Sequence, residues 1–281
     1  MSAAPETVGE VVRRTAARLE TEGVLTARLD AELIVAHVLG LTRAGLAVER
    51  SRPVTAAEGE RVAALAERRA AREPLQYVLG EWGFRRLSLT VDRRALIPRP
   101  ETETVVERCL ALLAGVDAPR VLDVGTGSGA IALAIADEHP GAAVTGIDVS
   151  ADALSLAREN AAHTGVAIEL LQVDMLGGLP GAGWDLIVSN PPYVRPDEAT
   201  TLAPEVVDWE PHVALFDGGH TETLVRDAAA VLRPGGALVL ESYDARARAV
   251  ARLLERAGLE QVVVTRDLAG RDRVVEGRLP A

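Results

Sequence analysis

The chain is poor in cysteine, lysine, aromatic residues and long apolar runs. Its single cysteine, Cys109, excludes an intramolecular disulfide and any zinc site that needs several cysteines. Cys109 stands in an apolar run, so we expect a buried structural thiol. The five histidines show no metal-ligand spacing, so no metal is expected. No apolar stretch approaches the ~18 residues of a membrane span and no signal-peptide core is present, so we expect a cytoplasmic protein.

The charge balance is acidic. There are 41 acidic residues against 30 basic ones, all of them arginine, for a formal net charge of -11. Proteins that read a nucleic-acid duplex normally carry a basic patch, so the balance disfavours direct nucleic-acid binding. Aromatic residues are only 3%, so the cores must be aliphatic. A length of 281 residues allows two domains.

The first 100 residues predict helices followed by a hairpin. Apolar residues recur at helical spacing through residues 1–73, where Thr26 and Thr55 are candidate helix caps. We therefore predict a helical domain there. Two strand-like runs, Leu75–Gly80 and Arg86–Val91, predict a β-hairpin linker over residues 74–100.

Residues 101–281 predict a parallel α/β domain, because short aliphatic strands alternate with helical runs. The predicted strands are 121–124, 143–147, 168–173, 184–189, 237–241, 261–265 and 273–275, and the predicted helices after the first strand are 130–138, 151–163, 222–232 and 245–257. The connection 267–272 is too short for a crossover helix, so the last two strands should pair antiparallel.

A glycine-rich loop follows the first strand of this domain. Gly125, Gly127 and Gly129 alternate with Thr126 and Ser128, which allows a tight turn and a close approach of a ligand to the backbone. A dinucleotide fingerprint would read G-x-G-x-x-G, so the spacing disfavours a nicotinamide-dependent oxidoreductase. A purely structural strand-to-helix turn is the other alternative.

Acidic residues surround this loop at strand ends. Asp148 closes the second strand, where a carboxylate can accept hydrogen bonds from a ribose diol. Asp123 precedes the glycines and can hold an ammonium group, while Asp174 can take an adenine amino group with Met175 against the ring. A nucleoside joined to an amino acid describes S-adenosylmethionine, which we predict as the cofactor, with S-adenosylhomocysteine as product. Asp174 alone could equally be a strand-end cap.

The fourth strand ends in Asn190-Pro191-Pro192-Tyr193. In a doubly wound sheet this strand end lies beside the first-strand loop. The prolines donate no N–H, and the Asn190 side chain and the Pro191 carbonyl are acceptors for a planar amine, with Tyr193 as a flat face. Candidate nucleophiles are adenine N6, cytosine N4, guanine N2 and a glutamine amide. A plain turn is the alternative.

These residues resemble the HemK/PrmC family of release factor N5-glutamine methyltransferases over almost the whole chain. The resemblance rests on Glu73–Tyr77 with Gly80, Ile97–Glu103, Asp123–Ala132, Asn190–Tyr193, Glu210-Pro211 with Ala214-Leu215, and Asp267–Arg273. It implies an α/β fold with a class I methyltransferase (Rossmann-like) seven-stranded sheet in residues 101–281, an N-terminal helical domain (1–73) for substrate recognition and a β-hairpin linker (74–100).

The resemblance also implies the activity and its residues. The substrate would be the Gly-Gly-Gln glutamine of class I release factors, bound by Asn190–Tyr193, with Asn190, Pro191 and Tyr193 catalytic. Asp123, Gly125–Gly129, Asp148, Asp174, Met175 and Asn190 would bind the cofactor. Arg99–Glu103 would flank the pocket or cap a helix. We expect a monomer.

Two alternatives share the same pocket chemistry. A ribosomal protein L3 glutamine methyltransferase usually has Pro-Arg-Ser-Pro where this chain has Pro98-Arg99-Pro100-Glu101, and a DNA or RNA base-amine methyltransferase is disfavoured by the charge. A cofactor-binding protein without activity is disfavoured by the intact Asn190–Tyr193. One departure from the family pattern is Glu241–Arg246, a loop expected to lie away from the pocket.

Overall fold

The computed structural model describes residues 5–281, so residues 1–4 of the predicted 1–73 domain lie outside the described part. Internal contacts divide the chain into two units. The first contains the residues up to Gly80 together with Ala203–Trp209, and the second contains Glu81–Leu202 and Glu210–Ala281. The predicted boundaries after residues 73 and 100 stay predictions.

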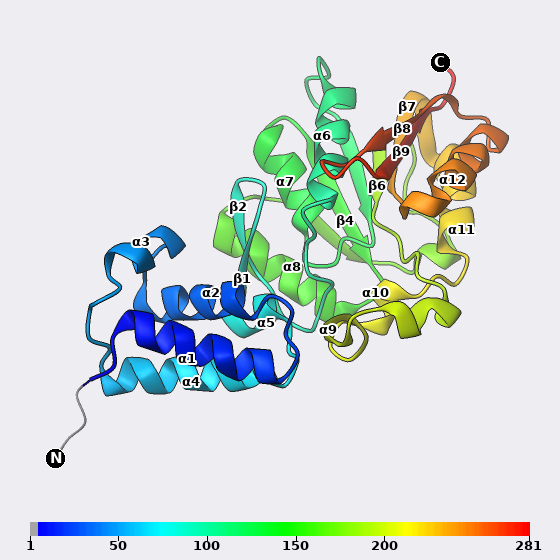
Figure 1. Cartoon of the computed structure of the whole chain (residues 1–281). Helices are drawn as coiled ribbons and strands as arrows, with labels where there is room; N and C mark the ends of the chain where they lie inside the picture. The colour runs from blue at the N-terminus through cyan, green and yellow to red at the C-terminus, as the bar shows by residue number, and fades with distance from the viewer. Residues whose placement is uncertain (1–4) are drawn as a thin grey trace. The chain divides into compact units, whose positions relative to one another are not determined.

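The first unit is helical (Figure 1). Its aliphatic core joins residues such as Val11, Leu19 and Ile34, each fully buried. Thr55 caps the fourth helix in a capping box with Glu58, as its position predicts. The helices are α1 (Val8–Thr21), α2 (Ala27–Leu39), α3 (Arg43–Val48), α4 (Ala56–Ala70), α5 (Leu75–Leu79) and α9 (Pro204–Val207).

Two local predictions in this unit are wrong. Thr26 occupies the N-cap position of α2 but its side chain accepts no capping hydrogen bond. Leu75–Gly80, predicted as a strand, forms the helix α5. Gly80 ends α5 at φ +78°, and Arg68 donates to the carbonyls of Tyr77 and Val78 at 3.0 and 3.2 Å. These hydrogen bonds to carbonyls at the end of α5 come from a side chain of α4, which the sequence of the short apolar run does not reveal.

The return of Ala203–Trp209 to the first unit was not predicted. Glu205 of α9 accepts hydrogen bonds from Arg69 and Arg72, each at 2.8 Å. Arg69 is buried and also donates to the buried Asp30 at 2.7 Å. Because removing one partner would leave a buried charge without compensation, this cluster fixes α9 in the first unit.

The second unit is an α/β sandwich whose strands follow the order β5-β4-β3-β6-β7-β9-β8. The first five strands are parallel, and β9 pairs antiparallel with β7 and β8, which confirms the predicted fold class. The strands are β3 (Arg120–Val124), β4 (Ala143–Asp148), β5 (Glu169–Gln172), β6 (Trp184–Ser189), β7 (Leu232–Glu241), β8 (Glu260–Arg266) and β9 (Asp272–Arg278).

A separate two-stranded hairpin precedes the sheet. It pairs β1 (Glu81–Phe84) with β2 (Leu87–Thr90), so only the second of the two predicted hairpin runs is a strand. The remaining elements of this unit are α6 (Thr102–Leu113), α7 (Ala130–Glu138), α8 (Ala151–Thr164), the 3-10 turns η1 (Met175–Gly177) and η2 (Pro196–Thr201), α10 (His212–Leu215), α11 (His220–Val231) and α12 (Asp244–Arg256).

Helices cover both faces of the sheet (Figure 1). Val121 of β3 packs in a cluster with α6 and α7, whereas its neighbour Leu122 packs in a cluster with α11 and α12. This alternation follows from the two-residue period of a strand. Cys109 of α6 is fully buried in the first cluster, as predicted, and burial raises its pKa well above the usual value.

Among residues 5–281, no helix combines the length and the hydropathy that a membrane crossing requires. The same described part contains no group of three or more His, Cys, Asp or Glu side chains arranged to hold a metal ion.

Candidate active site

The glycine loop joins β3 to α7 and is tied to the neighbouring strand. Gly125, Gly127 and Gly129 have φ angles of +71°, +55° and +82°, which non-glycine residues rarely adopt. The N–H groups of Gly125 and Thr126 both donate to the Ile147 carbonyl, at 2.8 and 2.9 Å. The loop is therefore held against the end of β4 by main-chain contacts.

Asp148 at the end of β4 is fixed by backbone donors. One carboxylate oxygen accepts from the Gly127 N–H at 2.9 Å and the other from the Ser150 N–H at 2.9 Å. Burial raises the pKa of Asp148. Each oxygen retains acceptor capacity, so the carboxylate can receive a further donor such as a ribose hydroxyl.

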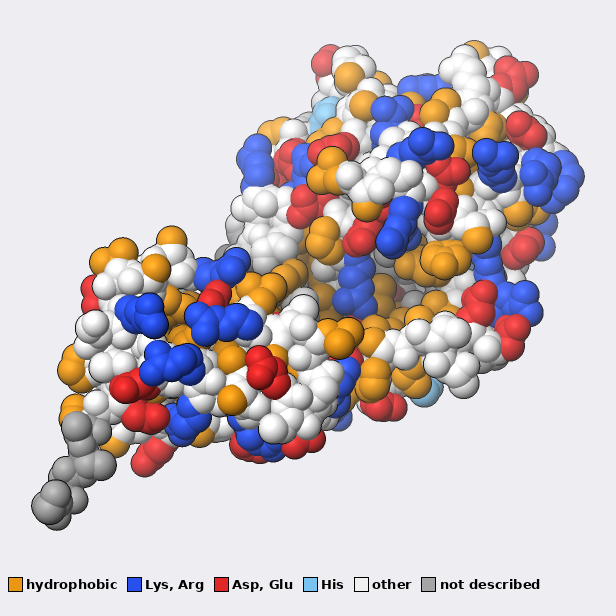
Figure 2. Space-filling view, viewed as in Figure 1, with side chains coloured by type: hydrophobic (Ala, Val, Ile, Leu, Met, Phe, Trp, Pro, Cys, Tyr) orange, Lys and Arg blue, Asp and Glu red, His pale blue; other side chains and the backbone are white. Residues whose placement is uncertain are grey.

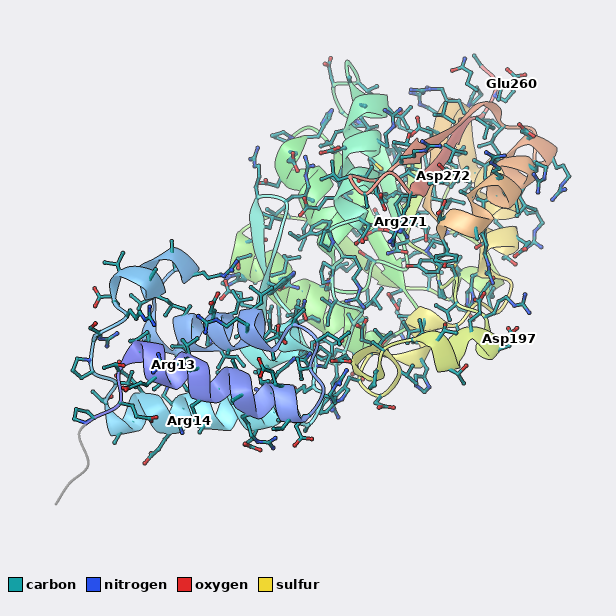
Figure 3. All side chains as sticks on the ribbon, in the orientation of Figure 1. Arg13, Arg14, Asp197, Glu260, Arg271 and Asp272 are labelled. Carbon is teal, nitrogen blue, oxygen red and sulfur yellow. The ribbon has the colours of Figure 1, made fainter. Side chains whose placement is uncertain are left out.

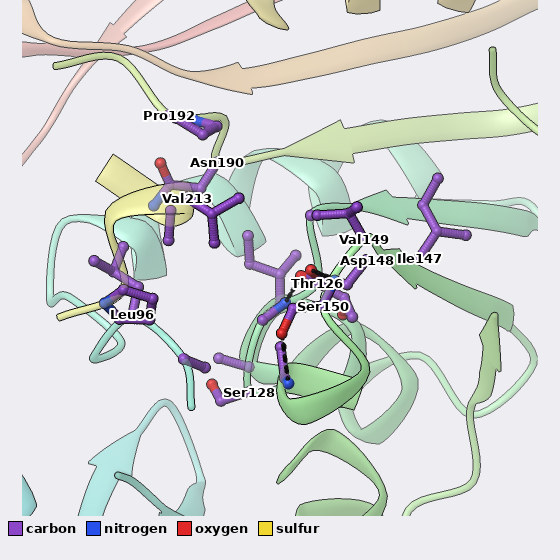
Figure 4. Close-up of a pocket in the computed structure, with 18 of the residues that line it drawn as sticks. Leu96, Thr126, Ser128, Ile147, Asp148, Val149, Ser150, Asn190, Pro192 and Val213 are labelled. Carbon is purple, nitrogen blue, oxygen red and sulfur yellow. Dashed lines mark hydrogen bonds between the residues drawn. The ribbon is translucent and has the colours of Figure 1, made fainter. Parts of the chain in front are cut away.

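A pocket opens where the carboxyl ends of β3, β4, β5 and β6 meet (Figure 4). Such edges of parallel sheets are the usual ligand sites of doubly wound folds. Of the residues predicted for the cofactor, those lining it are Gly125, Thr126, Gly127, Ser128, Asp148, Asp174, Met175 and Asn190. Asp123 and Gly129 do not line it.

Asp123 lies beneath the loop rather than on the pocket wall. It is fully buried, and its Oδ2 accepts from the Thr126 hydroxyl at 2.6 Å and the Ala132 N–H at 3.2 Å. Its Oδ1 has no hydrogen-bond donor within the described residues. Burial raises the pKa of Asp123 to about 7. One oxygen of the Asp123 carboxyl group therefore holds the loop in place, and the other, Oδ1, has no donor among the described residues.

Asp174 caps the turn η1, since its carboxylate accepts from the Leu176 N–H at 2.9 Å. It also lines the pocket together with Met175. Both interpretations of Asp174 from the sequence are therefore compatible with its position.

Asn190 and Pro192, which follow β6, contribute to the opposite wall (Figure 4). Asn190 and Pro192 line the pocket, whereas Pro191 is buried and Tyr193 is outside the lining. The hydroxyl of the preceding residue, Ser189, donates to the Val124 carbonyl at 2.7 Å, which ties the end of β6 to the end of β3. Burial, together with the charge of Glu241, raises the pKa of Tyr193 to about 12.

The Ile97–Glu103 stretch also reaches the pocket. Ile97, Pro98, Arg99 and Thr102 line it, and Arg99 donates to the buried carboxylate of Glu210. Burial raises the pKa of Glu210. The same stretch also enters α6, since Glu101 is the N-cap residue of that helix. Its side chain makes no capping hydrogen bond, and Glu103 accepts from the Arg85 N–H.

The prediction that the Glu241–Arg246 loop lies away from the pocket is also wrong. Glu241 accepts a hydrogen bond from the Thr102 hydroxyl at 2.6 Å, and Thr102 in turn accepts from Asn190 at 3.5 Å. The Tyr243 ring stacks on that of Tyr193, with centroids 6.5 Å apart. Glu241 ends β7, which is adjacent to β6, so its place at a strand end was the signal that could have located it.

Two family models match the chain. One describes the PrmC N-terminal domain and matches residues 10–80, and the other describes the methyltransferase small domain and matches residues 108–265. A release factor glutamine methyltransferase of Deinococcus radiodurans is 43% identical over 273 residues, covering 96% of this chain and 97% of the relative. The enzyme of the same name from Geobacter sulfurreducens is 39% identical over 286 residues, covering 99% and 100%.

The chain belongs to the release factor glutamine methyltransferase family.

A solved structure supports the fold independently of this family. The T. thermophilus 16S rRNA N2 G1207 methyltransferase, in complex with AdoMet and guanosine, matches with a TM-score of 0.52. The match has 22% identity and covers 71% of this chain but 49% of that one. At this identity the likeness shows a methyltransferase fold and nothing about the substrate.

The two walls of the pocket present different polar groups. On one wall, the Asp148 carboxylate can accept hydrogen bonds from a ribose, and the glycine loop allows a ligand to approach the backbone closely. On the other wall, Asn190 supplies an amide carbonyl, an acceptor for an N–H nucleophile. The two walls belong to adjacent strands, so a cofactor and an acceptor amide can meet between them.

Proposed function

We propose that this protein transfers the methyl group of S-adenosylmethionine to the side-chain amide nitrogen, N5, of the glutamine in the Gly-Gly-Gln motif of class I peptide chain release factors. The observation that carries the proposal is the position of Asn190 on the pocket wall that faces the glycine loop and Asp148. The names of the relatives support the choice of glutamine over other planar amines.

The cofactor, when bound, supplies an electrophilic methyl group on a sulfonium. Asp148 would accept from its ribose hydroxyls, and Met175 with Asp174 would contact its adenine. Asp123 does not line the pocket, so it would support the ammonium end of the cofactor indirectly, through the Thr126 hydroxyl and the Ala132 N–H that its Oδ2 holds behind the glycine loop.

Asn190 would orient the acceptor amide. Its Oδ1 and the Pro191 carbonyl would accept the two hydrogens of the glutamine NH2, which directs the nitrogen toward the methyl group. These acceptors also favour the positive charge that develops on nitrogen during attack. Pro192 and Tyr193 would flank the glutamine side chain. No strongly basic residue is needed before attack: the nitrogen–carbon bond would form as the sulfur–methyl bond breaks, leaving S-adenosylhomocysteine, and the proton would then pass from the nitrogen to water.

The partner would be a release factor, and the first unit would take part in recognising it. The charge on the visible faces is mixed rather than of one sign (Figure 2). Arg13 and Arg14 on α1, for example, are exposed, and Arg14 pairs with Glu6 (Figure 3). This mixture favours a protein partner over a nucleic-acid backbone. Because release factors act on ribosomes, we propose that the enzyme acts in the cytoplasm. We also propose that it acts as a monomer, since one chain supplies every residue to which a role is assigned.

Intact mass spectrometry tests the proposal. Unmethylated release factor 1, ribosomal protein L3 and duplex DNA are each incubated with the enzyme and S-adenosylmethionine. We expect one added methyl group on the release factor, located on the Gly-Gly-Gln glutamine by fragmentation. When the Asn190→Ala enzyme replaces the wild type, we expect no added methyl group. Methylation of L3 or DNA alone would retain the pocket chemistry and overturn the substrate. Methylation of none would overturn the activity.

A further inference from the structure

Behind Asn190 lies a buried pair of side chains that the proposed reaction does not use directly. The Asn190 amide donates to the Thr102 hydroxyl oxygen at 3.5 Å, and the Thr102 hydroxyl donates to Glu241 Oε2 at 2.6 Å. Thr102 and Glu241 are 4% and 2% exposed, so water does not compete for these contacts. Glu241 Oε1 has no partner in the described part of the chain.

The direction of these hydrogen bonds follows from counting hydrogens. An ionised carboxylate can only accept, so Glu241 commits the single hydrogen of the Thr102 hydroxyl to itself. The Thr102 oxygen can then only accept a hydrogen bond from Asn190, so the Asn190 side chain must direct its NH2 group toward Thr102. Since the carboxamide is planar, its Oδ1 is then on the opposite branch, available to the substrate side.

We infer that Thr102 and Glu241 are positioning residues, which set the orientation of the Asn190 amide so that its oxygen, not its NH2 group, meets the substrate amide. This inference rests on the proposed methylation of an amide. It assigns a role to the strand end at Glu241 that the pocket lining alone does not suggest. Thr102 lines the pocket and Glu241 does not, and we assign the effect of both residues to the hydrogen bonds that connect them to Asn190.

Protonation of Glu241 reverses the order of donors. A protonated carboxyl can donate to the Thr102 oxygen, which frees the Thr102 hydrogen to donate to Asn190 Oδ1. The Asn190 NH2 group then turns toward the substrate and opposes its N–H groups. Burial raises the pKa of Glu241 to about 7. The charged and titratable groups acting on this region are Arg273 on β9, Arg99 and Glu101 before α6, and Tyr193 after β6.

The sign of the pH dependence follows directly. Because burial raises the pKa of Glu241, the carboxyl group is protonated as the pH falls through that raised pKa, and the productive orientation of Asn190 is lost on the acid side. We expect kcat of the wild-type enzyme, measured with saturating cofactor and release factor, to fall about tenfold per pH unit on the acid side. In Glu241→Gln this limb should disappear between pH 6 and 8.

A pair of threonine variants separates positioning from folding. Thr102→Val keeps the shape of the side chain but removes the hydroxyl, and we expect kcat at pH 8 to fall about 10- to 100-fold because the acceptor amide is no longer oriented. Its KM for S-adenosylmethionine should stay within about twofold, since this interaction acts on the substrate side. Thr102→Ser restores the hydroxyl and should recover most of the rate.

A matched control exists in the same sheet. Thr145 of β4 is also buried, and its hydroxyl donates to Glu169 at 2.9 Å, but neither residue lines the pocket. Thr145→Val removes the same chemical group and should leave kcat and its pH profile at wild-type values. Circular dichroism and calorimetric titration of S-adenosylmethionine check that each variant is folded.

The outcomes distinguish this inference from the proposed function. Wild-type kcat in Thr102→Val, or an acid limb that persists in Glu241→Gln, would overturn the positioning role while the methylation stands. If Glu241→Gln does not fold, the comparison of Thr102→Val with Thr102→Ser decides alone: equal rates overturn the inference. If the wild type transfers no methyl group to a release factor at any pH, the proposed function itself fails.

Discussion

The two walls of the pocket are built in different ways. On the wall that we propose for the cofactor (the cofactor wall), Asp148 is held by N–H groups of the adjacent glycine loop and of its own following turn. On the wall that we propose for the substrate (the substrate wall), Asn190 contacts Thr102, 88 positions earlier in the chain, and Thr102 contacts Glu241, 139 positions after Thr102. One wall depends on backbone geometry, and the other on side chains contributed by distant elements.

This difference predicts different sensitivities to substitution. Backbone donors remain when side chains change, so the cofactor wall should respond mainly to loss of the carboxylate itself. The substrate wall depends on a series of buried polar contacts, in which the loss of one member leaves another unsatisfied. Changes far from the pocket in sequence should therefore alter the rate of methyl transfer more than the affinity for the cofactor.

The largest expected effect is that of Asn190→Ala. It removes the acceptor that orients the substrate amide, so we expect the single-turnover rate to fall about 100- to 1000-fold. Affinity for S-adenosylmethionine, measured by titration calorimetry, should change only modestly. A loss of binding as large as the loss of rate would place Asn190 on the cofactor wall and break the comparison.

A smaller effect of the opposite kind is expected for Asp148→Ala. Loss of the ribose acceptor should weaken S-adenosylmethionine binding about 10- to 100-fold, as for a charged hydrogen-bond partner. The rate at saturating cofactor should fall much less. Asp152→Ala, which removes an exposed carboxylate from the first turn of α8, is the matched control. Unchanged calorimetry for Asp148→Ala would remove it from the ribose site.

The smallest effect is expected for Tyr243→Ala. The ring stacks on Tyr193 with an interplanar angle of 18°, and such pairs contribute about 0.5–1.5 kcal/mol. We expect KM for the release factor to rise about two- to tenfold if this stack supports Tyr193 at the substrate wall. Tyr243→Phe keeps the ring and should retain the wild-type KM. Equal KM values for both variants would show that the stack does not act on the substrate.

Predictions from the sequence agree best with the structure where local backbone patterns decide the outcome, and least where distant side chains do. The strand β6 has the predicted bounds of residues 184–189, and the helix α7 those of residues 130–138, because both are short apolar segments with clear boundaries. The glycine loop and Asp148 were found from spacing alone. Leu75–Gly80 was misjudged because such a short apolar run is equally compatible with a strand, and contacts with Arg68 complete the helix end.

The sequence alone therefore determined the fold class and both pocket motifs, because aliphatic periodicity, glycine spacing and prolines act through local backbone geometry. Only the tertiary structure decided that Glu241 lies behind Asn190, that Asp123 lies beneath the loop instead of lining it, and that Ala203–Trp209 joins the first unit. These relations depend on which buried polar groups find partners across the sheet and between helices. The partners of Glu241 and of Glu205 lie far apart in the chain, so no local pattern specifies them. The partners of Asp123 are near in sequence, but its burial depends on how the loop packs over it.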